Sequence, residues 1–198
     1  MRFIRIEEVC SPHLPDGLIY LINLITSFTF IMNTLEKFRR IKAFIFDVDG
    51  VLTDHSVFLF ENGKIVRRLN ERDLFALKKA VDNKFKVAII SGGNLSGLIP
   101  TFKALGITDI FEKQGDKKEA YDTFKYSYEL DDEHILYMGD DLPDYSVMRI
   151  VGLPTCPNNA APEIKEITQY LSPFKGGEGC VRDVIEKILK LKKNWHNG

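Results

Sequence analysis

The feature that most constrains the fold is a set of short apolar runs, each followed by acidic or small polar residues. Residues 43–46 (AFIF), 87–90 (VAII) and 135–138 (ILYM) are the clearest examples. A strand that is apolar on both faces must be covered on both faces, as happens in a parallel sheet between two layers of helices. We therefore expect an α/β fold with a doubly wound parallel sheet.

The segments between these runs predict the remaining elements. Residues 57–60 and 64–66 are rich in strand-forming side chains and flank Asn62-Gly63, which indicates a β-hairpin. Asp73 is expected to cap a helix that runs to residue 82. Further helices are expected over residues 95–105, 117–128, 162–167 and 181–191, and another with Pro143 in its first turn, with short strands near Ile110 and Leu153.

The composition excludes some classes of function. Lys and Arg number 27 against 28 Asp and Glu, a net charge of -1, so the basic surplus expected of a nucleic-acid-binding protein is missing. The three cysteines are widely spaced and form no CxxC pair, which argues against a zinc site and favours a reducing, cytoplasmic setting.

The N-terminal segment does not fit this pattern. Residues 17–32 are strongly apolar, but the run is short for a membrane span and contains several polar side chains. Acidic residues interrupt the positive region that a signal peptide would need, and no cleavage site follows. We interpret residues 1–34 as an extension outside the fold, with Met32 as the natural start and residues 35–198 as one domain. A membrane anchor is the alternative.

Polar residues follow the apolar runs where a ligand would bind, because ligands of open α/β sheets lie beyond the carboxyl ends of the strands. Asp47 and Asp49 follow the first run, Ser91 the second, and Asp140 and Asp141 the third. Each alone has an ordinary explanation as a turn or a helix cap. Their joint occurrence indicates a site.

The types of residue point to phosphoryl transfer. Asp47 can attack phosphorus and form a mixed anhydride. Asp49 can protonate the leaving alcohol and then activate water. Mg²⁺ prefers oxygen ligands, which Asp47, Asp140 and the backbone carbonyl of Asp49 would supply. The remaining predicted roles are phosphate binding for Ser91, Gly92 and Lys117, and support behind the metal ligands for Asp141 and Asp144.

The chain resembles the haloacid dehalogenase superfamily over about residues 41–189. The resemblance rests on four motifs in order: residues 47–54 (DVDGVLTD), Ser91-Gly92, Lys117 and residues 139–144 (GDDLPD). Residues 70–73 (NERD), 114–117 (QGDK) and 175–179 (KGGEG) resemble one branch, the 3-deoxy-D-manno-octulosonate 8-phosphate phosphatases of lipopolysaccharide precursor synthesis. This resemblance implies Mg²⁺-dependent hydrolysis of a small sugar acid phosphate through an aspartyl-phosphate.

The spacing leaves no room for the cap domain that many superfamily members carry. Between Asp54 and Ser91 only a hairpin and a helix fit, and between Ser91 and Lys117 only a helix and a short strand. An uncapped site either serves a macromolecule or is closed by another subunit. The resemblance implies the second case, a homotetramer in which the hairpin, residues 57–68, contacts a neighbouring site.

The identity of the substrate stays open at this point. The chain has His55 and Leu74 where the resembled branch often has glycine, and Gly93 and Glu178 where it often has arginine. A nine-carbon 2-keto-3-deoxy sugar acid phosphate is therefore a competing substrate. Candidates for substrate contact are Arg67, Arg68, Arg72, Lys175 and Glu178.

Other classes of protein share parts of the pattern. A receiver-type phosphoacceptor domain also combines a phosphorylatable aspartate, an acidic cluster and a lysine. Its acidic pair comes early and its lysine last, whereas here Asp140 and Asp141 follow Lys117. A phosphomutase uses two aspartates at the same spacing, but usually needs a cap.

Overall fold

The computed structural model describes residues 24–25, 34–63 and 65–195. The chain divides into two units, Met1–Glu36 and Lys37–Gly198. The predicted extension, residues 1–34, lies outside the described residues except at positions 24, 25 and 34, so the boundary after residue 34 stays a prediction. None of the described helices is both long enough and apolar enough to cross a membrane.

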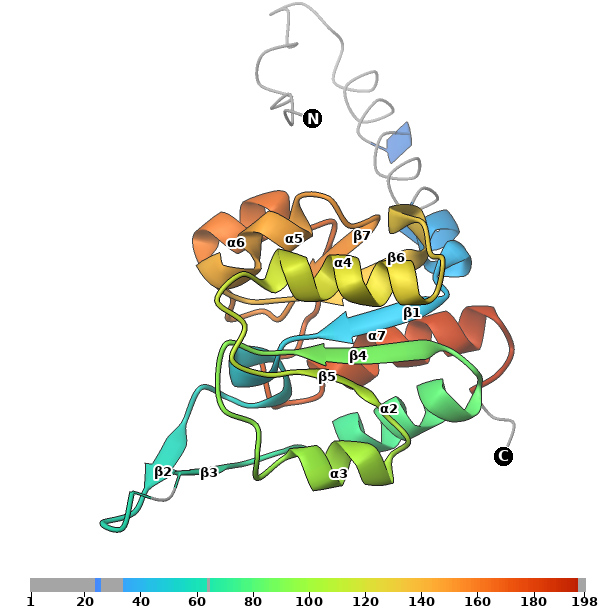
Figure 1. The fold of residues 1–198 in the computed structure, drawn as a ribbon. Coiled ribbons are helices and arrows are strands. Elements are labelled where there is room, and N and C mark those ends of the chain that lie inside the picture. The colour runs from blue at the N-terminus through green and yellow to red at the C-terminus, as the bar shows by residue number, and fades with distance from the viewer. Residues whose placement is uncertain (1–23, 26–33, 64, 196–198) are drawn as a thin grey trace, which may run out of the picture. The chain divides into compact units, whose positions relative to one another are not determined.

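The second unit is built on a parallel sheet that has six strands in the described part of the chain (Figure 1). They are β1 (Ala43–Phe46), β4 (Lys86–Ile90), β5 (Asp109–Phe111), β6 (Ile135–Met138), β7 (Leu153–Cys156) and β8 (Tyr170–Leu171). Their order is β5-β4-β1-β6-β7-β8, and every neighbouring pair is parallel. The first strand therefore lies inside the sheet with later strands on both sides, the doubly wound arrangement that the sequence predicts.

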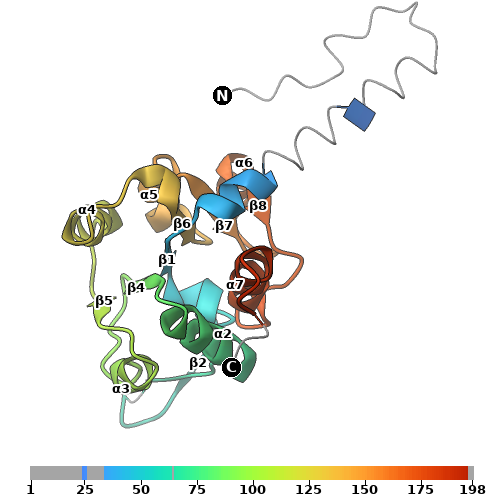
Figure 2. The same cartoon turned by 90° about the vertical axis from the view of Figure 1, so that its right-hand side faces the viewer.

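Helices cover both faces of this sheet, as the apolar runs require (Figure 2). Phe44 and Phe46 of β1 belong to one buried cluster, and Ala43 and Ile45 to the other, because successive side chains of a strand point to opposite faces. The first cluster contains residues of α2 (Glu71–Asp82), α3 (Ile99–Ala104) and α7 (Cys180–Leu191). The second contains residues of α4 (Lys117–Ser127), α5 (Tyr145–Met148) and α6 (Pro162–Ile167).

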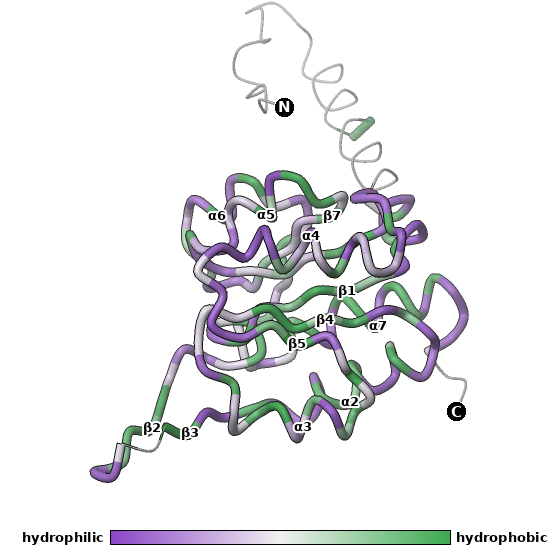
Figure 3. Tube along the Cα trace, in the orientation of Figure 1, coloured by the Kyte–Doolittle hydropathy of each residue, from purple (hydrophilic) through white to green (hydrophobic). Residues whose placement is uncertain are grey.

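A β-hairpin projects from this core beside the carboxyl ends of the strands (Figure 1). Its strands, β2 (Val57–Leu59) and β3 (Ile65–Arg67), are antiparallel, with Phe58 opposite Val66. The hairpin leaves several large apolar side chains exposed, and Figure 3 shows green, hydrophobic stretches at β2 and β3 and a purple, hydrophilic tip. No cap is inserted in the described chain: between β1 and β4 lie only the short turn η2 (Val48–Leu52), the hairpin and α2.

Two predicted helix starts are wrong. Helix α2 begins at Glu71, because the side chain of Asn70 caps it by accepting a hydrogen bond from the N–H of Arg72 (2.9 Å). Asp73 is instead buried and accepts hydrogen bonds from residues at the start of α7. Helix α3 begins at Ile99 rather than at residue 95, because residues 95–98 form a turn closed by a hydrogen bond from Leu98 N–H to the Leu95 carbonyl (2.7 Å).

Candidate active site

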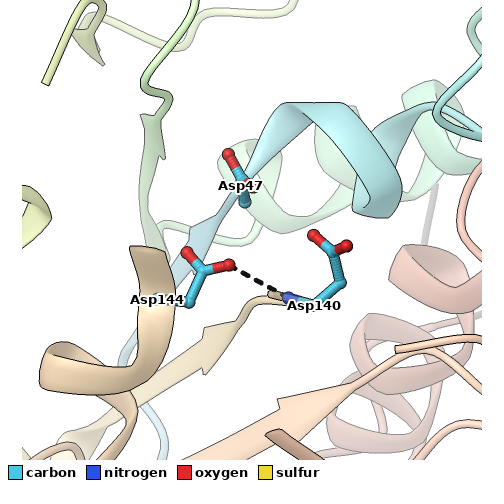
Figure 4. Close-up of side chains that lie close together, drawn as sticks. All are labelled: Asp47, Asp140 and Asp144. Atoms are coloured by element: carbon cyan, nitrogen blue, oxygen red, sulfur yellow. Dashed lines mark hydrogen bonds between the residues drawn. The ribbon is translucent and has the colours of Figure 1, made fainter. Parts of the chain in front are cut away.

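The sheet topology fixes the place of the site. From β1 the chain builds β4 and β5 on one side and then crosses to β6 on the other side of β1. The loops after β1 and β6 therefore diverge, and such switch points are where open α/β sheets bind ligands. Asp47 directly follows β1 and Asp140 lies two residues beyond β6 (Figure 4).

Two glycines allow the loops to come this close. Gly50 has φ +97°, and a Cβ there would lie 2.3 Å from Oδ2 of Asp140. A Cβ at Gly139 would lie 2.4 Å from Cγ of Asp144. Any larger residue at either position would therefore displace an acidic side chain of the site.

Four charged side chains meet at this point. Asp47, Asp140 and Asp144 each offer a carboxylate oxygen within 4.8 Å of the others (Figure 4). The ammonium of Lys117, from the start of α4, lies 3.0 Å from Oδ2 of Asp47 and 2.7 Å from Oδ1 of Asp144. All four are buried. Three carboxylates thus face one ammonium, a formal excess of two negative charges in a setting that strengthens electrostatic effects.

This arrangement shifts the pKa values of Asp47, Asp140 and Lys117. Burial, followed by repulsion from Asp144, raises the pKa of Asp47 to about 8 despite the attraction of Lys117. Burial and then repulsion from Asp144 also raise the pKa of Asp140 to about 7. Burial alone would lower the pKa of Lys117, but Asp144 and Asp47 outweigh it and the pKa is raised, so the lysine stays charged.

Asp144 holds its neighbours in place, and both of its carboxylate oxygens are already occupied by hydrogen bonds. Its Oδ1 accepts hydrogen bonds from Lys117 (2.7 Å) and from the Tyr137 hydroxyl (2.6 Å), and its Oδ2 accepts the N–H of Asp140 (3.0 Å). By contrast, Oδ1 of Asp140 is buried and makes no hydrogen bond. Such an orphaned buried oxygen is costly unless something binds it. With the excess negative charge, it makes Asp47 and Asp140 a fit for a hard divalent cation.

Asp49 lies beside the loop after β4, which carries the predicted phosphate-binding residues Ser91 and Gly92. Arg67, at the end of β3, donates to both of its carboxylate oxygens (2.7 and 3.1 Å) and also to the carbonyl of Asn94 (3.2 Å). A Cβ at Gly93 would lie 3.2 Å from the carboxylate of Asp49 and 3.5 Å from the hydroxyl of Ser91. The loop after β4 is therefore packed against Asp49, with buried Ser91 and exposed Gly92 in it.

The other predicted substrate contacts are spread around the site. Arg68 pairs with Asp54 (2.7 Å), while Arg72, Lys175 and Glu178 are exposed. Lys175 and Glu178 flank two buried glycines that pack on the loop after β1, since the N–H of Gly177 bonds to the Val51 carbonyl (2.9 Å). Asp141 caps the turn that follows it, accepting the N–H of Leu142 (2.8 Å).

Two residues at the site escaped the sequence reasoning. Tyr137 binds Asp144 from inside β6, and burial raises its pKa well above the usual value, so it remains a donor. The sequence feature that points to Tyr137 is its hydroxyl group, which stands in an otherwise apolar run just before Gly139-Asp140. His55 was noted only as a departure from the resembled family, yet its Nε2 lies 2.9 Å from Oδ2 of Asp140.

The fold and the acidic cluster define a haloacid dehalogenase-like hydrolase, and residues 106–184 match that family. The 3-deoxy-D-manno-octulosonate 8-phosphate phosphatases of Yersinia pestis and Escherichia coli K12 are each 32% identical over 157 residues, covering 79% of this chain and 84% of the relative. The chain belongs to the family of these phosphatases. This membership leaves no support for the receiver-type alternative.

Solved structures of related phosphatases have the same fold. The Yersinia pestis phosphatase superposes with a TM-score of 0.80 at 31% identity, covering 82% of this chain and 88% of that one. The Moraxella catarrhalis phosphatase, in complex with magnesium, phosphate and KDO, gives a TM-score of 0.78 at 30% identity, covering 81% and 92%. The cobalt-bound Haemophilus influenzae phosphatase gives a TM-score of 0.77 at 28% identity, covering 80% and 93%.

Proposed function

We propose that this chain hydrolyses the phosphate monoester of a 2-keto-3-deoxy sugar acid, 3-deoxy-D-manno-octulosonate 8-phosphate, with Mg²⁺ as its cofactor. The observation that carries the proposal is the buried cluster of Asp47, Lys117 and Asp144 beside Asp140 at the switch point. The names of the similar phosphatases support the choice of substrate.

The Mg²⁺ ion would be held by the carboxylates of Asp47 and Asp140 and by the backbone carbonyl of Asp49. When bound, it supplies positive charge that offsets the excess of carboxylates and polarises the phosphoryl oxygens. The unpaired Oδ1 of Asp140 supports this assignment. The oxygen atoms of Asp144 are already taken by donors, so that residue is assigned to holding Lys117 and the loop after β6.

The reaction then has two steps, formation and hydrolysis of an aspartyl-phosphate. A carboxylate oxygen of Asp47 attacks phosphorus, the bond between phosphorus and the sugar oxygen breaks, and Asp49 gives its proton to the leaving alcohol. Asp49, now ionised, takes a proton from water, whose oxygen attacks the same phosphorus. The bond to Asp47 breaks, and phosphate leaves.

Three groups are proposed to hold the phosphoryl oxygens during both steps. They are the hydroxyl of Ser91, the backbone N–H of Gly92 and the ammonium of Lys117. The position of the ammonium supports its role, since it lies 3.0 Å from the attacking carboxylate and can neutralise charge on the transferring group.

Arg67 is the best-placed candidate for the carboxylate of the sugar acid. Its guanidinium is largely buried and grips Asp49 through two hydrogen bonds. While both oxygens of its carboxylate accept hydrogen bonds from Arg67, Asp49 has no proton to donate. A substrate carboxylate that competes for Arg67 would release Asp49 for acid catalysis, so binding of the correct substrate and activation of the acid would be linked.

We also propose that the enzyme is a cytoplasmic homotetramer whose hairpin closes a neighbouring site. The apolar side chains of the hairpin that are exposed in one subunit support this assembly: Val57, Phe58, Leu59, Phe60, Ile65 and Val66. The cysteines Cys156 and Cys180 are buried free thiols, in keeping with a reducing compartment.

Steady-state kinetics on a panel of sugar phosphates tests the function. We expect the eight-carbon acid 8-phosphate to give the highest kcat/KM, with activity lost in EDTA and restored by Mg²⁺. A preference for the nine-carbon acid 9-phosphate would reassign the substrate, in line with the unusual Gly93 and Glu178. Full activity after exhaustive chelation would contradict the metal assignment.

A further inference from the structure

His55 occupies an unusual position in the loop that follows β1. Its Nε2 lies 2.9 Å from Oδ2 of Asp140, and its imidazole is half-exposed whereas Asp140 is buried. It thus reaches from the surface to the carboxylate that the proposed function gives to the metal. The mechanism described above assigns no role to this contact.

The backbone conformation of His55 indicates that surrounding contacts hold this residue in place. The residue has φ +66°, the left-handed region that side chains other than glycine rarely adopt. Such strained residues persist where surrounding contacts determine them, and they concentrate at functional sites. Here the imidazole and the carboxylate meet over Gly50, where a Cβ would lie 2.3 Å from both Cε1 of His55 and Oδ2 of Asp140.

His55 is not placed to be a metal ligand itself. The groups whose ligand atoms all lie within 4.8 Å of one another in the described chain are Asp47, Asp140 and Asp144, and His55 is outside this set. Opposite ligands of one small ion at a bond length of about 2.1 Å are only about 4.2 Å apart. His55 contacts Oδ2 of Asp140, while Oδ1 remains without a hydrogen-bond partner.

We propose that His55 is a positioning residue that fixes the carboxylate of Asp140 so that Oδ1 faces the metal. This inference rests on the proposed function. A carboxylate that binds a metal is ionised and has no hydrogen to donate, so Nε2 would carry the hydrogen in this pair once the metal is bound. Without the imidazole, the carboxylate of Asp140 can rotate about its terminal bond. Part of the free energy of metal binding is then used to fix its orientation. Partners that orient a metal ligand in this way typically change metal affinity about 10- to 100-fold.

Calorimetric titration of Mg²⁺ and of Mn²⁺ into the metal-free protein tests the inference. The variants are His55→Gly, which removes the imidazole and relieves the strained backbone, and His55→Gln, which keeps a donor. The matched control is Lys84→Gly, because Lys84 also has φ +66° but is exposed in the turn between α2 and β4, at the opposite ends of the strands.

We expect His55→Gly to weaken the affinity for both metals about 10- to 100-fold, His55→Gln to retain part of the affinity, and Lys84→Gly to match the wild type. The Mg²⁺ concentration that gives half-maximal turnover by His55→Gly should rise by the same factor, because occupancy of the metal site then limits the rate.

Equal metal affinity in His55→Gly and the wild type would overturn the inference alone and leave the proposed function intact. A wild type that binds neither metal would overturn both. Magnetic coupling of the histidine nitrogen to bound Mn²⁺ at bonding distance would also overturn it, since His55 would then be a ligand.

Discussion

Asp47 shows how a single residue can favour function at the expense of stability. Its pKa is raised to about 8, chiefly by burial and then by Asp144, so its charge is costly in the folded protein. We predict that Asp47→Asn abolishes turnover, because an amide cannot form the anhydride. The metal-free variant should nevertheless melt at or above the temperature of the wild type, because one buried negative charge is gone.

Phosphate release in the presence of Mg²⁺ and thermal melting in EDTA, measured on the same preparation, check this prediction. Asp49→Asn is the comparison: it should turn over, but about 10²- to 10⁴-fold more slowly, the usual range for a lost general acid and base. Wild-type turnover by Asp47→Asn would contradict the covalent mechanism. A large drop in melting temperature would contradict the electrostatic argument.

At this scale the sequence predicted which carboxylates and which lysine gather, because motif spacing and strand ends place Asp47, Asp140 and Lys117. It did not predict the partners of those residues. The contacts of Asp144 with Tyr137 and Lys117 join residues that are 7 and 27 positions apart on different elements. Pairing of that kind depends on how the elements pack, which no local pattern encodes.

Between elements, the residues that resemble the phosphatase branch make contacts that hold α2 to α7. Asp73 of α2 accepts hydrogen bonds from the N–H groups of Gly179 (3.2 Å) and Arg182 (2.7 Å) at the start of α7, and Asn70 donates to the carbonyl of Gly177 (3.1 Å). The motif at residues 70–73 therefore fixes the loop at residues 175–179, which packs against the loop carrying Gly50.

Asp73 gives a pH-dependent test of this link. Burial is the main cause that raises its pKa from 3.8 to about 6, so between these values the folded protein holds a proton that the unfolded chain releases. Its contribution to the free energy of unfolding is thus fully present below about pH 4, falls as the pH rises, and is lost above about pH 6.

We predict that Asp73→Asn, which cannot ionise, lacks this decline. The wild type should lose on the order of 1 to 3 kcal/mol relative to the variant between about pH 4 and pH 7, as measured by urea unfolding of metal-free protein. Asp82→Asn, at the exposed end of the same helix, is the control and should follow the wild type. A pH-independent gap between wild type and Asp73→Asn would show that the carboxyl does not titrate in this range.

The elements themselves were predicted well where the pattern was strong. Strands β1 and β6 and helix α6 have the expected bounds, because each is a short apolar or proline-started segment with clear ends. The start of α2 was misplaced, because two capping residues, Asn70 and Asp73, compete locally and only tertiary contacts decide between them. The start of α3 was misplaced, because residues 95–98 close a turn before the helix begins.

For the whole molecule, the hairpin is the feature that a single subunit leaves unexplained. Among the described strands, those of the hairpin pair only with each other, and Phe58 and Leu59 are 61% and 71% exposed. Exposed apolar surface of this kind usually marks an interface. The site also lacks a cap in the described chain, yet the aspartyl-phosphate must be kept from water until the alcohol leaves. Both features are consistent with closure by a neighbouring hairpin.

We therefore predict that replacing Phe58 and Phe60 together with Ser weakens the assembly, because the interface loses its largest apolar side chains. KM for the sugar acid phosphate should rise much more than KM for a small aryl phosphate, since the aryl substrate needs little beyond the metal and the phosphate-binding groups. Sedimentation in parallel with kinetics measures both effects. The control is Phe75→Ser, an exposed phenylalanine on α2 whose ring packs against Trp195. A variant that dissociates yet keeps wild-type selectivity would show that each subunit completes its own site.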